Sequence, residues 1–282
     1  MVPGSRGRGD FAIRAFSFAL AVAGACVVML PFAWMLSSAF KAESEIFRAP
    51  PQWIPRPIQW QNLAKSLAVL PFGIYYRNTL LITAVTMIGD VLTAAIVAYG
   101  FARFRFPGRN TLFVLVLSTL MLPVQVTIIP RFVMFKWLHW VDTFAPLIVP
   151  AFFGGSAFYI FLLRQFIMTI PRELDDAAKI DGLGYPAIFR RIIIPLAKPS
   201  LAIIAIFSFL YNWNDFFVPL IFLNSESHYT VALGLTSLKG HFFSTINLLM
   251  AASLIAMSPC VVLFFIAQRY FIGGVVVTGV KG

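Results

Sequence analysis

Six long apolar stretches constrain the fold of this 282-residue chain more than any other feature. They run approximately over residues 15–38, 78–102, 112–135, 144–170, 201–223 and 247–268. Each is close to the roughly 20 residues that an α-helix needs to cross the hydrocarbon core of a bilayer. The chain is also 60% hydrophobic and only 12% charged, unlike a soluble domain. We therefore expect an all-α membrane protein with six transmembrane helices.

The first apolar stretch follows a basic segment, which is a pattern that secretory signal peptides share. The sequence Ala-Gly-Ala-Cys26 within it also resembles a lipoprotein cleavage site. The apolar residues nevertheless continue past Cys26 to Trp34, beyond the length of a signal-peptide core. We expect this segment to remain in the protein as a membrane helix.

Two of the predicted spans contain residues that interrupt helices. Pro123 and Pro130 lie inside the 112–135 stretch, so that helix is predicted to be kinked or broken. Gly154 and Gly155 interrupt the 144–170 stretch. Arg164, near the end of the same stretch, is expected to extend to the membrane interface as an anchor.

The distribution of lysine and arginine predicts the orientation in the membrane. The net charge is +11, and six spans place both termini on one side. Most of the 22 lysines and arginines fall on that side, so both termini are predicted to be cytoplasmic. Basic membrane loops account for the charge without a nucleic-acid partner. The predicted parts are a cytoplasmic N-terminus (1–14), a membrane domain (15–270) with an external loop (39–77) and a cytoplasmic loop (171–198), and a cytoplasmic C-terminal tail (271–282).

Motifs for metal binding or catalysis are absent from the sequence. Its two cysteines, Cys26 and Cys260, lie in apolar stretches, and its three histidines are far apart. The chain contains neither a Gly-x4-Gly-Lys-Ser/Thr phosphate loop nor a His-Glu-x-x-His or Gly-x-Ser-x-Gly motif. We expect no metal site, no catalytic residue and no cofactor in this chain.

The cytoplasmic loop, residues 171–198, is predicted to form two short helices. Pro171 suits the first turn of a helix, and three acidic side chains follow near its positive end. Gly182 is a natural helix stop. A second helix is predicted over 187–192, before Pro195 and Pro199 mark the return to the membrane.

One face of the first loop helix is small enough to fit against a partner. Leu174, Ala177, Ala178 and Asp181 share this face on a helical wheel. The alternative is an amphipathic connector that lies on the membrane surface. Such a helix should present a broad face of Trp, Phe or Leu, and this helix offers one leucine and alanines instead.

The loop also resembles a known family motif. Asp176-Ala-Ala, three residues, Gly182, nine residues and Ile192-x-Ile194-Pro195 are similar to the EAA loop of ABC importer permeases, with Asp in place of Glu and Ile in place of Leu. The longer pattern up to Asp181-Gly182 is typical of the carbohydrate branch. That branch often has Ala-Ser after the glycine, whereas this chain has Leu-Gly.

The resemblance extends along nearly the whole chain. Further stretches similar to this family, and in particular to MalG-like subunits, are Ser38–Lys41, Ala98–Arg109, Met121–Gln125, Trp213–Pro219, Gln268–Gly274 and Gly279–Gly282. The resemblance implies the MetI/MalG-like permease architecture with six transmembrane helices. It also implies a location in the bacterial or archaeal cytoplasmic membrane.

The same resemblance implies a function and a set of partners. The chain would form half of a sugar pathway, beside a second, MalF-like permease, an ATPase dimer that holds ATP and Mg²⁺, and an extracytoplasmic solute-binding protein. Its EAA loop would couple to the ATPase. The implied coupling residues are Leu174, Asp176, Ala177, Ala178, Asp181, Gly182 and Pro195.

Polar residues inside the apolar stretches are candidates for the transport path. Asn212, Asn214 and Asp215 lie within the fifth stretch beside aromatic residues, a combination that suits a sugar. Their alternative role is hydrogen bonding between helices or with the partner permease. Gln125, between the two prolines of the third stretch, is a further candidate for the path.

Asp90 in the second stretch separates the competing functions. It is either a structural residue, neutral or paired with a donor on another helix, or a proton site in a secondary transporter. A secondary transporter commonly has an internal repeat and intramembrane ion pairs, and the sequence shows neither. A membrane enzyme needs clustered His, Asp or Glu at an interface, and the sequence has no such cluster there. Within the importer family, glycerol-3-phosphate or another small polar solute is the alternative substrate. A phosphorylated substrate should need Arg or Lys in the path, and the spans offer few.

Overall fold

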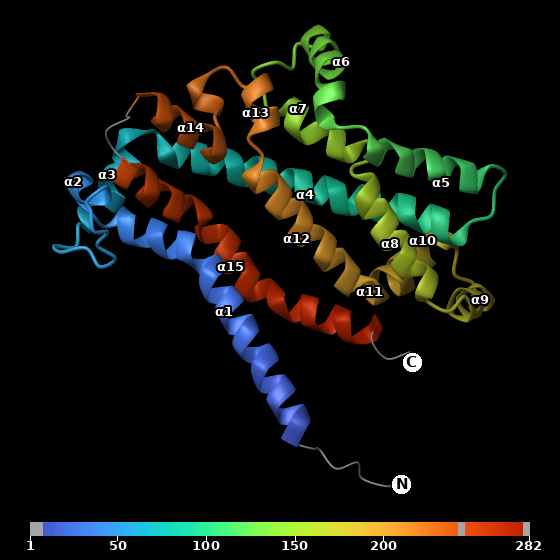
Figure 1. The fold of residues 1–282 in the computed structure, drawn as a ribbon. Helices are drawn as coiled ribbons and strands as arrows, with labels where there is room; N and C mark the ends of the chain where they lie inside the picture. The colour runs from blue at the N-terminus through green and yellow to red at the C-terminus, as the bar shows by residue number, and fades with distance from the viewer. Residues whose placement is uncertain (1–7, 242–245, 279–282) are drawn as a thin grey trace. The chain divides into compact units, whose positions relative to one another are not determined.

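The second apolar stretch forms the central helix of the larger of two compact units. A computed structural model describes the backbone of residues 8–241 and 246–278. In it, α4 (Phe72–Arg103) has 32 residues and a length of about 48 Å. Buried alanines, among them Ala94, Ala95 and Ala98, let α8 (Ala157–Thr169) and α12 (Lys198–Asn214) pack against α4 (Figure 1).

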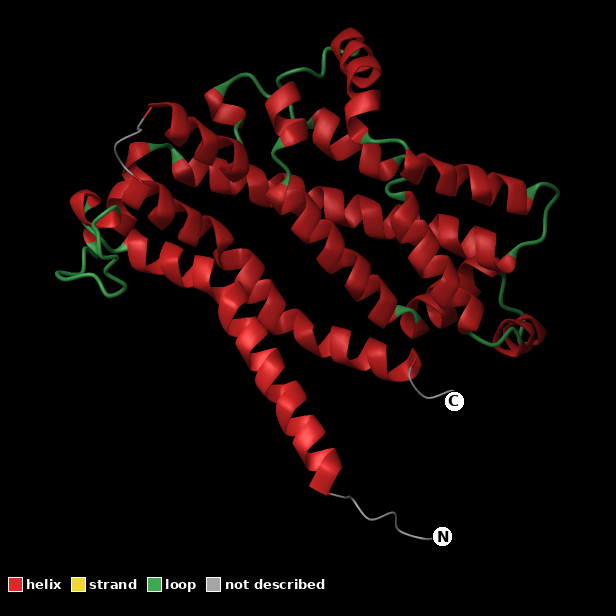
Figure 2. Cartoon of the chain, in the orientation of Figure 1, coloured by secondary structure: helices red, strands yellow, loops and turns green. Residues whose placement is uncertain are grey.

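This larger unit comprises residues 71–236 and 256–282, so it contains the first part of α14 (Val231–His241) and most of the long helix α15 (Ile246–Thr278). Among the residues that the structure describes, all regular elements are helices, and loops connect them (Figure 2). The remaining helices are α5 (Arg109–Ser118), α6 (Val124–Trp137), α7 (Ala145–Ile148), α9 (Glu173–Ile180), α10 (Tyr185–Ile188), α11 (Ile194–Leu196), α13 (Phe217–Phe222) and α14 (Val231–His241). Short 3-10 helices cover Thr119–Met121, Val149–Phe152 and Glu226–His228, and a π-helix covers Phe189–Ile193.

The smaller unit comprises residues 1–70 and 237–255. It contains α1 (Arg8–Ala39), α2 (Glu43–Ile46), α3 (Gln61–Val69) and the first part of α15 (Ile246–Thr278). The buried amide of Asn62 ties the end of α1 to α3, because its Nδ2 donates to the carbonyl oxygens of Ala39 at 3.0 Å and of Lys41 at 2.9 Å. The Lys41 ammonium lies 4.0 Å from the centre of the Trp34 ring.

The described helices account for the predicted spans. Four of them are long and apolar enough to cross a membrane, and there are up to six spans if each of two bent helix pairs is one span. One bent pair is α5 with α6, which meet at 99° beside Pro123, where the sequence predicts a break. The other pair joins the 185–196 segment to α12 at 77°. The predicted all-α membrane fold is therefore confirmed, with four to six candidate spans in the described residues.

The boundary of one predicted span is wrong. The stretch 201–223 does not form one helix, because α12 ends at Asn214 and α13 begins at Phe217. Asp215 Oδ1 accepts a hydrogen bond from the Val218 N–H at 3.3 Å and so caps the new helix. The predicted tail at 271–282 is helical as far as Thr278, while residues 1–7 and 279–282 lie outside the described part of the chain.

Candidate functional site

A polar cavity lies beside α4 in the middle of the larger unit. Four buried α4 residues, Thr79, Ile82, Thr86 and Asp90, line it. They are three or four positions apart, so they lie on one face of the helix. The cavity measures about 320 Å³ and lies within the range of small-molecule sites.

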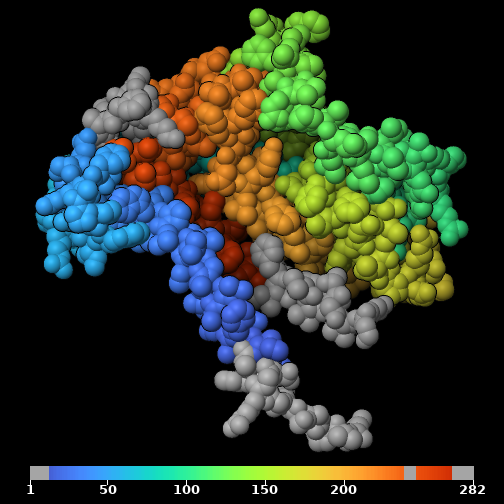
Figure 3. Space-filling view, viewed as in Figure 1, coloured from blue at the N-terminus to red at the C-terminus, as the bar shows by residue number. Residues whose placement is uncertain are grey.

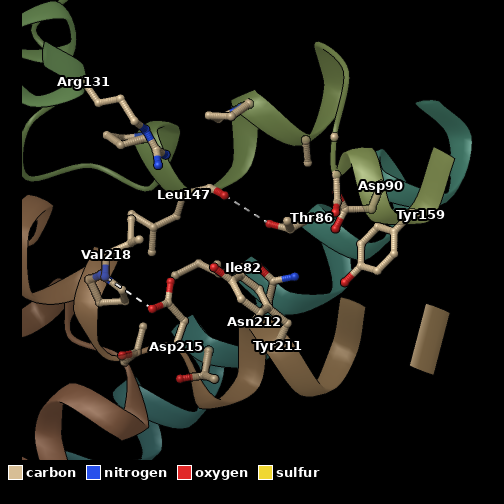
Figure 4. A pocket seen from close by; sticks show the side chains of 18 residues that line it. Ile82, Thr86, Asp90, Arg131, Leu147, Tyr159, Tyr211, Asn212, Asp215 and Val218 are labelled. Carbon is tan, nitrogen blue, oxygen red and sulfur yellow. Dashed lines mark hydrogen bonds between the residues drawn. The ribbon is translucent and has the colours of Figure 1, made fainter. Parts of the chain in front are cut away.

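The other walls come from several segments that are distant in sequence. The end of α12 contributes Tyr211 and Asn212, and Asp215 follows the helix. Arg131 comes from α6 and Tyr159 from α8. Figure 4 shows these side chains around the cavity, with Arg131 and Asp90 on opposite sides of the view.

Hydrogen bonds hold the cavity walls together. Ser208 Oγ on α12 donates to Asp90 Oδ2 on α4 at 2.6 Å, and both residues are buried. Asn212 Nδ2 donates to the Ser208 carbonyl oxygen at 2.7 Å, which orients its amide. Thr86 Oγ1 donates to the Leu147 carbonyl oxygen at 3.4 Å. The donor on another helix that the sequence analysis anticipates for Asp90 is thus Ser208.

The cavity carries two carboxylates and one guanidinium. Arg131 attracts Asp215 electrostatically, although no ion pair within 4.0 Å joins them in the described residues. Hydroxyl groups of Thr86 and Tyr159 and the aromatic ring of Tyr211 complete the lining. Directional polar groups beside an aromatic surface suit a solute with many hydroxyl groups and an apolar face.

The structure brings together three of the five residues predicted for the path. Asn212, Asp215 and Asp90 line the cavity, whereas Asn214 and Gln125 do not. Asn214 Nδ2 instead donates to the Leu210 carbonyl oxygen at 2.8 Å, because residues two apart on α12 point in different directions. Arg131 also lines the cavity, and its signal in the sequence is a charge in the middle of an apolar helix.

The 171–198 loop is fixed to the end of α4 by a buried ion pair. Arg103 Nε lies 3.0 Å from Asp175 Oδ2, with side chains that are 4% and 10% exposed. Arg103 Nη2 also donates to the Ile170 carbonyl oxygen at 3.0 Å. Tyr99 donates its hydroxyl to the Tyr185 carbonyl oxygen at 3.4 Å. The same helix that lines the cavity therefore holds the loop.

The loop helix α9 ends before Gly182 as predicted, but it begins after Pro171 instead of at this residue. It covers Glu173–Ile180, and Gly182 follows with φ +82°, a left-handed conformation that glycine adopts easily. The second helix begins at Tyr185, two residues before its predicted start, and continues into the π-helix and α11, which contains Pro195. Figure 3 shows the loop (olive-yellow) at the molecular surface.

The predicted docking face of α9 needs one correction. Ala178 is only 4% exposed and packs into the hydrophobic core, so it does not belong to an outward face. Its position follows from Asp175, one turn earlier, which pairs with Arg103 inside the protein. Of the predicted coupling residues, the exposed ones are Leu174, Asp176, Ala177, Asp181, Gly182 and Pro195, and Ile180 is exposed beside them.

An exposed ion pair marks the outward side of α9. Lys179 Nζ lies 2.8 Å from Asp176 Oδ1. This contact lowers the pKa of the Asp176 carboxyl and raises the pKa of the Lys179 ammonium. Beside it, Ile180 is 87% exposed, which leaves an apolar side chain in contact with water.

A second polar cluster joins the segment before α7 to the segment after α13. Asp142, at φ +63°, accepts hydrogen bonds at Oδ1 from the backbone N–H groups of Asn224 at 2.9 Å and Ser225 at 2.8 Å. Its other oxygen accepts a bond from the Ser225 hydroxyl, and His228 Nδ1 lies 3.2 Å from Oδ1. The bonds from Ser225 hold the pKa of Asp142 well below its usual range. No local sequence pattern indicates this cluster.

A family model matches residues 90–276 of the chain and is described as "Binding-protein-dependent transport system inner membrane component". This region contains Asp90, most of the cavity lining and the whole 171–198 loop. The chain belongs to this family. Its members are membrane components of transport systems, so the chain is a transport permease and not an enzyme.

Curated relatives of this permease are similar over most of its length. The sn-glycerol-3-phosphate transport system permease protein UgpE of Yersinia pestis is 33% identical over 269 residues, which cover 93% of this chain and 95% of that protein. The arabinooligosaccharides transport system permease protein AraQ of Halalkalibacterium halodurans is 38% identical over 208 residues, or 74% of each chain.

A solved structure shares the fold of this permease. It is the crystal structure of a bacterial ABC transporter involved in the import of the acidic polysaccharide alginate. Its matching chain has a TM-score of 0.82 and 21% identity, and the match covers 96% of this permease and 100% of that chain.

Within the described residues, no group of three or more His, Cys, Asp or Glu could hold a metal ion.

Proposed function

We propose that this permease forms half of the membrane pathway of an ATP-driven importer and transmits the work of an ATPase through its 171–198 loop. The observation that carries the proposal is the connection through α4. One end of α4 holds α9 by the Arg103–Asp175 pair, and the face from Thr79 to Asp90 lines the polar cavity. A displacement of α9 would therefore reach the cavity along one continuous helix.

The proposed assembly contains a second, MalF-like permease, two ATPase subunits and an extracytoplasmic binding protein. ATP and Mg²⁺ would bind to the ATPase subunits, since this sequence lacks a phosphate loop. Support for a binding protein comes from the family description and from a second solved structure, an alginate ABC transporter in complex with a periplasmic protein. Both termini would be cytoplasmic, on the side with most of the basic residues.

The proposed substrate is a neutral sugar. The cavity offers hydroxyl and amide groups beside Tyr211, and Arg131 is the one cationic side chain in its lining. A phosphorylated solute should need more than one Arg or Lys in the path. The alternative is glycerol-3-phosphate, which Arg131 could bind by a charge-assisted hydrogen bond and which the printed name of the Yersinia relative contains.

The docking proposal can be tested on the reconstituted complex with Ile180→Asp. Ile180 is exposed on α9, so the change adds charge to the docking side without opening the core. We expect the ATPase subunit to dissociate during purification and ATP-driven uptake to fall at least tenfold. The matched control is Phe47→Asp, which alters an exposed apolar residue next to α2 and should leave ATPase binding unchanged. Full uptake without any ATPase subunit would refute the proposal and direct attention to Asp90.

The substrate class can be tested with Arg131→Gln. If the substrate is a neutral sugar, removal of the guanidinium should change the apparent KM for uptake by less than about threefold. If the substrate is glycerol-3-phosphate, loss of a charge-assisted bond should raise KM by roughly tenfold or more. Competition with a panel of unlabelled sugars and phosphorylated solutes, measured on both proteins, separates these outcomes.

A further inference from the structure

Three arginines surround a second cavity where three membrane spans end. The cavity measures about 470 Å³, and its lining includes Arg105, Arg109 and Arg172. It lies just beyond the last residue of α4, at the first residue of α5 and shortly after the last residue of α8. Because these helices are spans or parts of spans, the cavity lies at the boundary of the hydrocarbon region.

No acidic side chain neutralises this cluster. None of the cavity's lining residues is an Asp or Glu, and its three arginines form no ion pair with any residue that the structure describes. The nearby carboxylates of Asp175 and Asp176 are paired with other cations. Arg164 on α8 adds to the positive potential through its interaction with Arg109. Asp176 also attracts Arg172 electrostatically, but three arginines and no lining acid leave the cavity with a net positive charge.

Backbone contacts orient two of the three guanidinium groups. Arg109 Nη1 donates to the Phe104 carbonyl oxygen at 3.2 Å, and Arg172 Nη2 donates to the Ala102 carbonyl oxygen at 3.3 Å. A guanidinium has five N–H donors, so each group retains donors for a ligand. The cavity also adjoins the first turn of α5, which no side chain caps and whose N–H groups at Asn110 and Thr111 can attract an anion.

We propose that this cavity binds the phosphate group of an anionic phospholipid. Arginine pairs with phosphate through parallel hydrogen bonds, and such fixed guanidinium groups suit that geometry. A lipid is favoured over a free phosphate ion because the cavity adjoins the ends of the spans and because Phe106, 39% exposed, adds an apolar surface to the lining. The assignment to the cytoplasmic leaflet rests on the proposed orientation, on the side where basic pockets between helices bind anionic head groups.

A lipid at this position would join the cavity to the 171–198 loop. Arg172 immediately precedes α9, and Arg105 and Arg109 lie on the connection from α4 to α5. A phosphate held by all three arginines would cross-link these segments. Anionic lipid would then restrain the base of α9 and increase the uptake achieved per ATP hydrolysed.

The test compares lipid retention by two triple variants of the full chain, purified with its partners. Arg105, Arg109 and Arg172 are replaced by Gln in the first, and the exposed Arg190, Arg191 and Lys198 by Gln in the matched control. Both proteins are placed in nanodiscs of phosphatidylcholine with phosphatidylglycerol, and the retained phosphatidylglycerol is measured by native mass spectrometry. We expect the first variant to lose retention by roughly tenfold and the control to match the wild type.

Other outcomes overturn the proposal. Equal losses in both variants would show a general attraction of anionic lipid to surface charge. Binding of inorganic phosphate that displaces phosphatidylglycerol at millimolar concentration would make the ligand a free anion. If the triple variant does not assemble, the single variant Arg105→Gln replaces it, because Arg105 is exposed. Unchanged phosphatidylglycerol retention in Arg105→Gln would count against the site. Retention is measured without ATP or substrate, so failure of the importer proposal does not alter this result.

Discussion

Replacing Arg103 by Met should detach the 171–198 loop from α4. Met has a similar length but no charge, so Asp175 would remain buried without its partner. Loss of one partner of a buried ion pair costs about 3–5 kcal/mol. Since the two side chains are only 4% and 10% exposed, solvent does not reduce this cost appreciably. Open states of α9 should become more populated by about two orders of magnitude or more.

Hydrogen exchange of the α9 amides in the assembled complex measures this opening directly. We expect faster exchange over Glu173–Ile180 in Arg103→Met, together with less substrate imported per ATP hydrolysed. The double variant Arg103→Met with Asp175→Asn should recover part of the protection, because it removes the unpaired charge. Lys179→Met, which breaks only an exposed pair on the same helix, is the control and should exchange as the wild type does. Equal exchange in Arg103→Met and Lys179→Met would refute the assigned role of the buried pair.

Three further outcomes are expected. The lowered pKa of Asp142 means that its carboxylate stabilises the 222–230 segment at neutral pH. This stabilisation declines only as the pH falls below the pKa of about 4 that Asp has in the unfolded chain. In Asp142→Asn, hydrogen exchange of the segment should no longer depend on pH in this way. Gly155→Ala should destabilise the protein by about 1–3 kcal/mol in thermal unfolding, because Gly155 has φ +53° and an added Cβ would lie 2.9 Å from Thr93 Oγ1. Gly100→Ala is the control and should be neutral or stabilising, because the space around Gly100 is open. Asn212→Ala should raise the apparent KM for uptake several-fold, and Asn214→Ala, outside the cavity, should not; equal effects would contradict the assignment of the cavity.

Local sequence patterns predict the spans because each depends on residues close together in the chain. The apolar stretches, the break at Pro123 and the stop at Gly182 are all of this kind. Proline removes a hydrogen bond donor and glycine permits a left-handed turn, whatever surrounds them. These features of the fold could therefore be located to within a few residues.

The contacts that build the sites depend on distant residues and could not be predicted in the same way. The sequence indicates only that Arg103 belongs to a basic loop. No local pattern shows that Arg103 pairs with Asp175. That pairing in turn decides that Ala178 faces inward, which a helical wheel alone cannot establish. Arg131 similarly enters the cavity only because α6 bends away from α5.

The arrangement of α4 has a consequence for how such permeases diverge. Asp90 and Arg103 are 13 positions apart, or about 20 Å along the helix. Substitutions around the cavity therefore leave the loop contact untouched, and changes at the loop do not alter the cavity lining. Selection can accordingly modify the choice of solute in one lineage while the proposed connection to an ATPase is inherited unchanged.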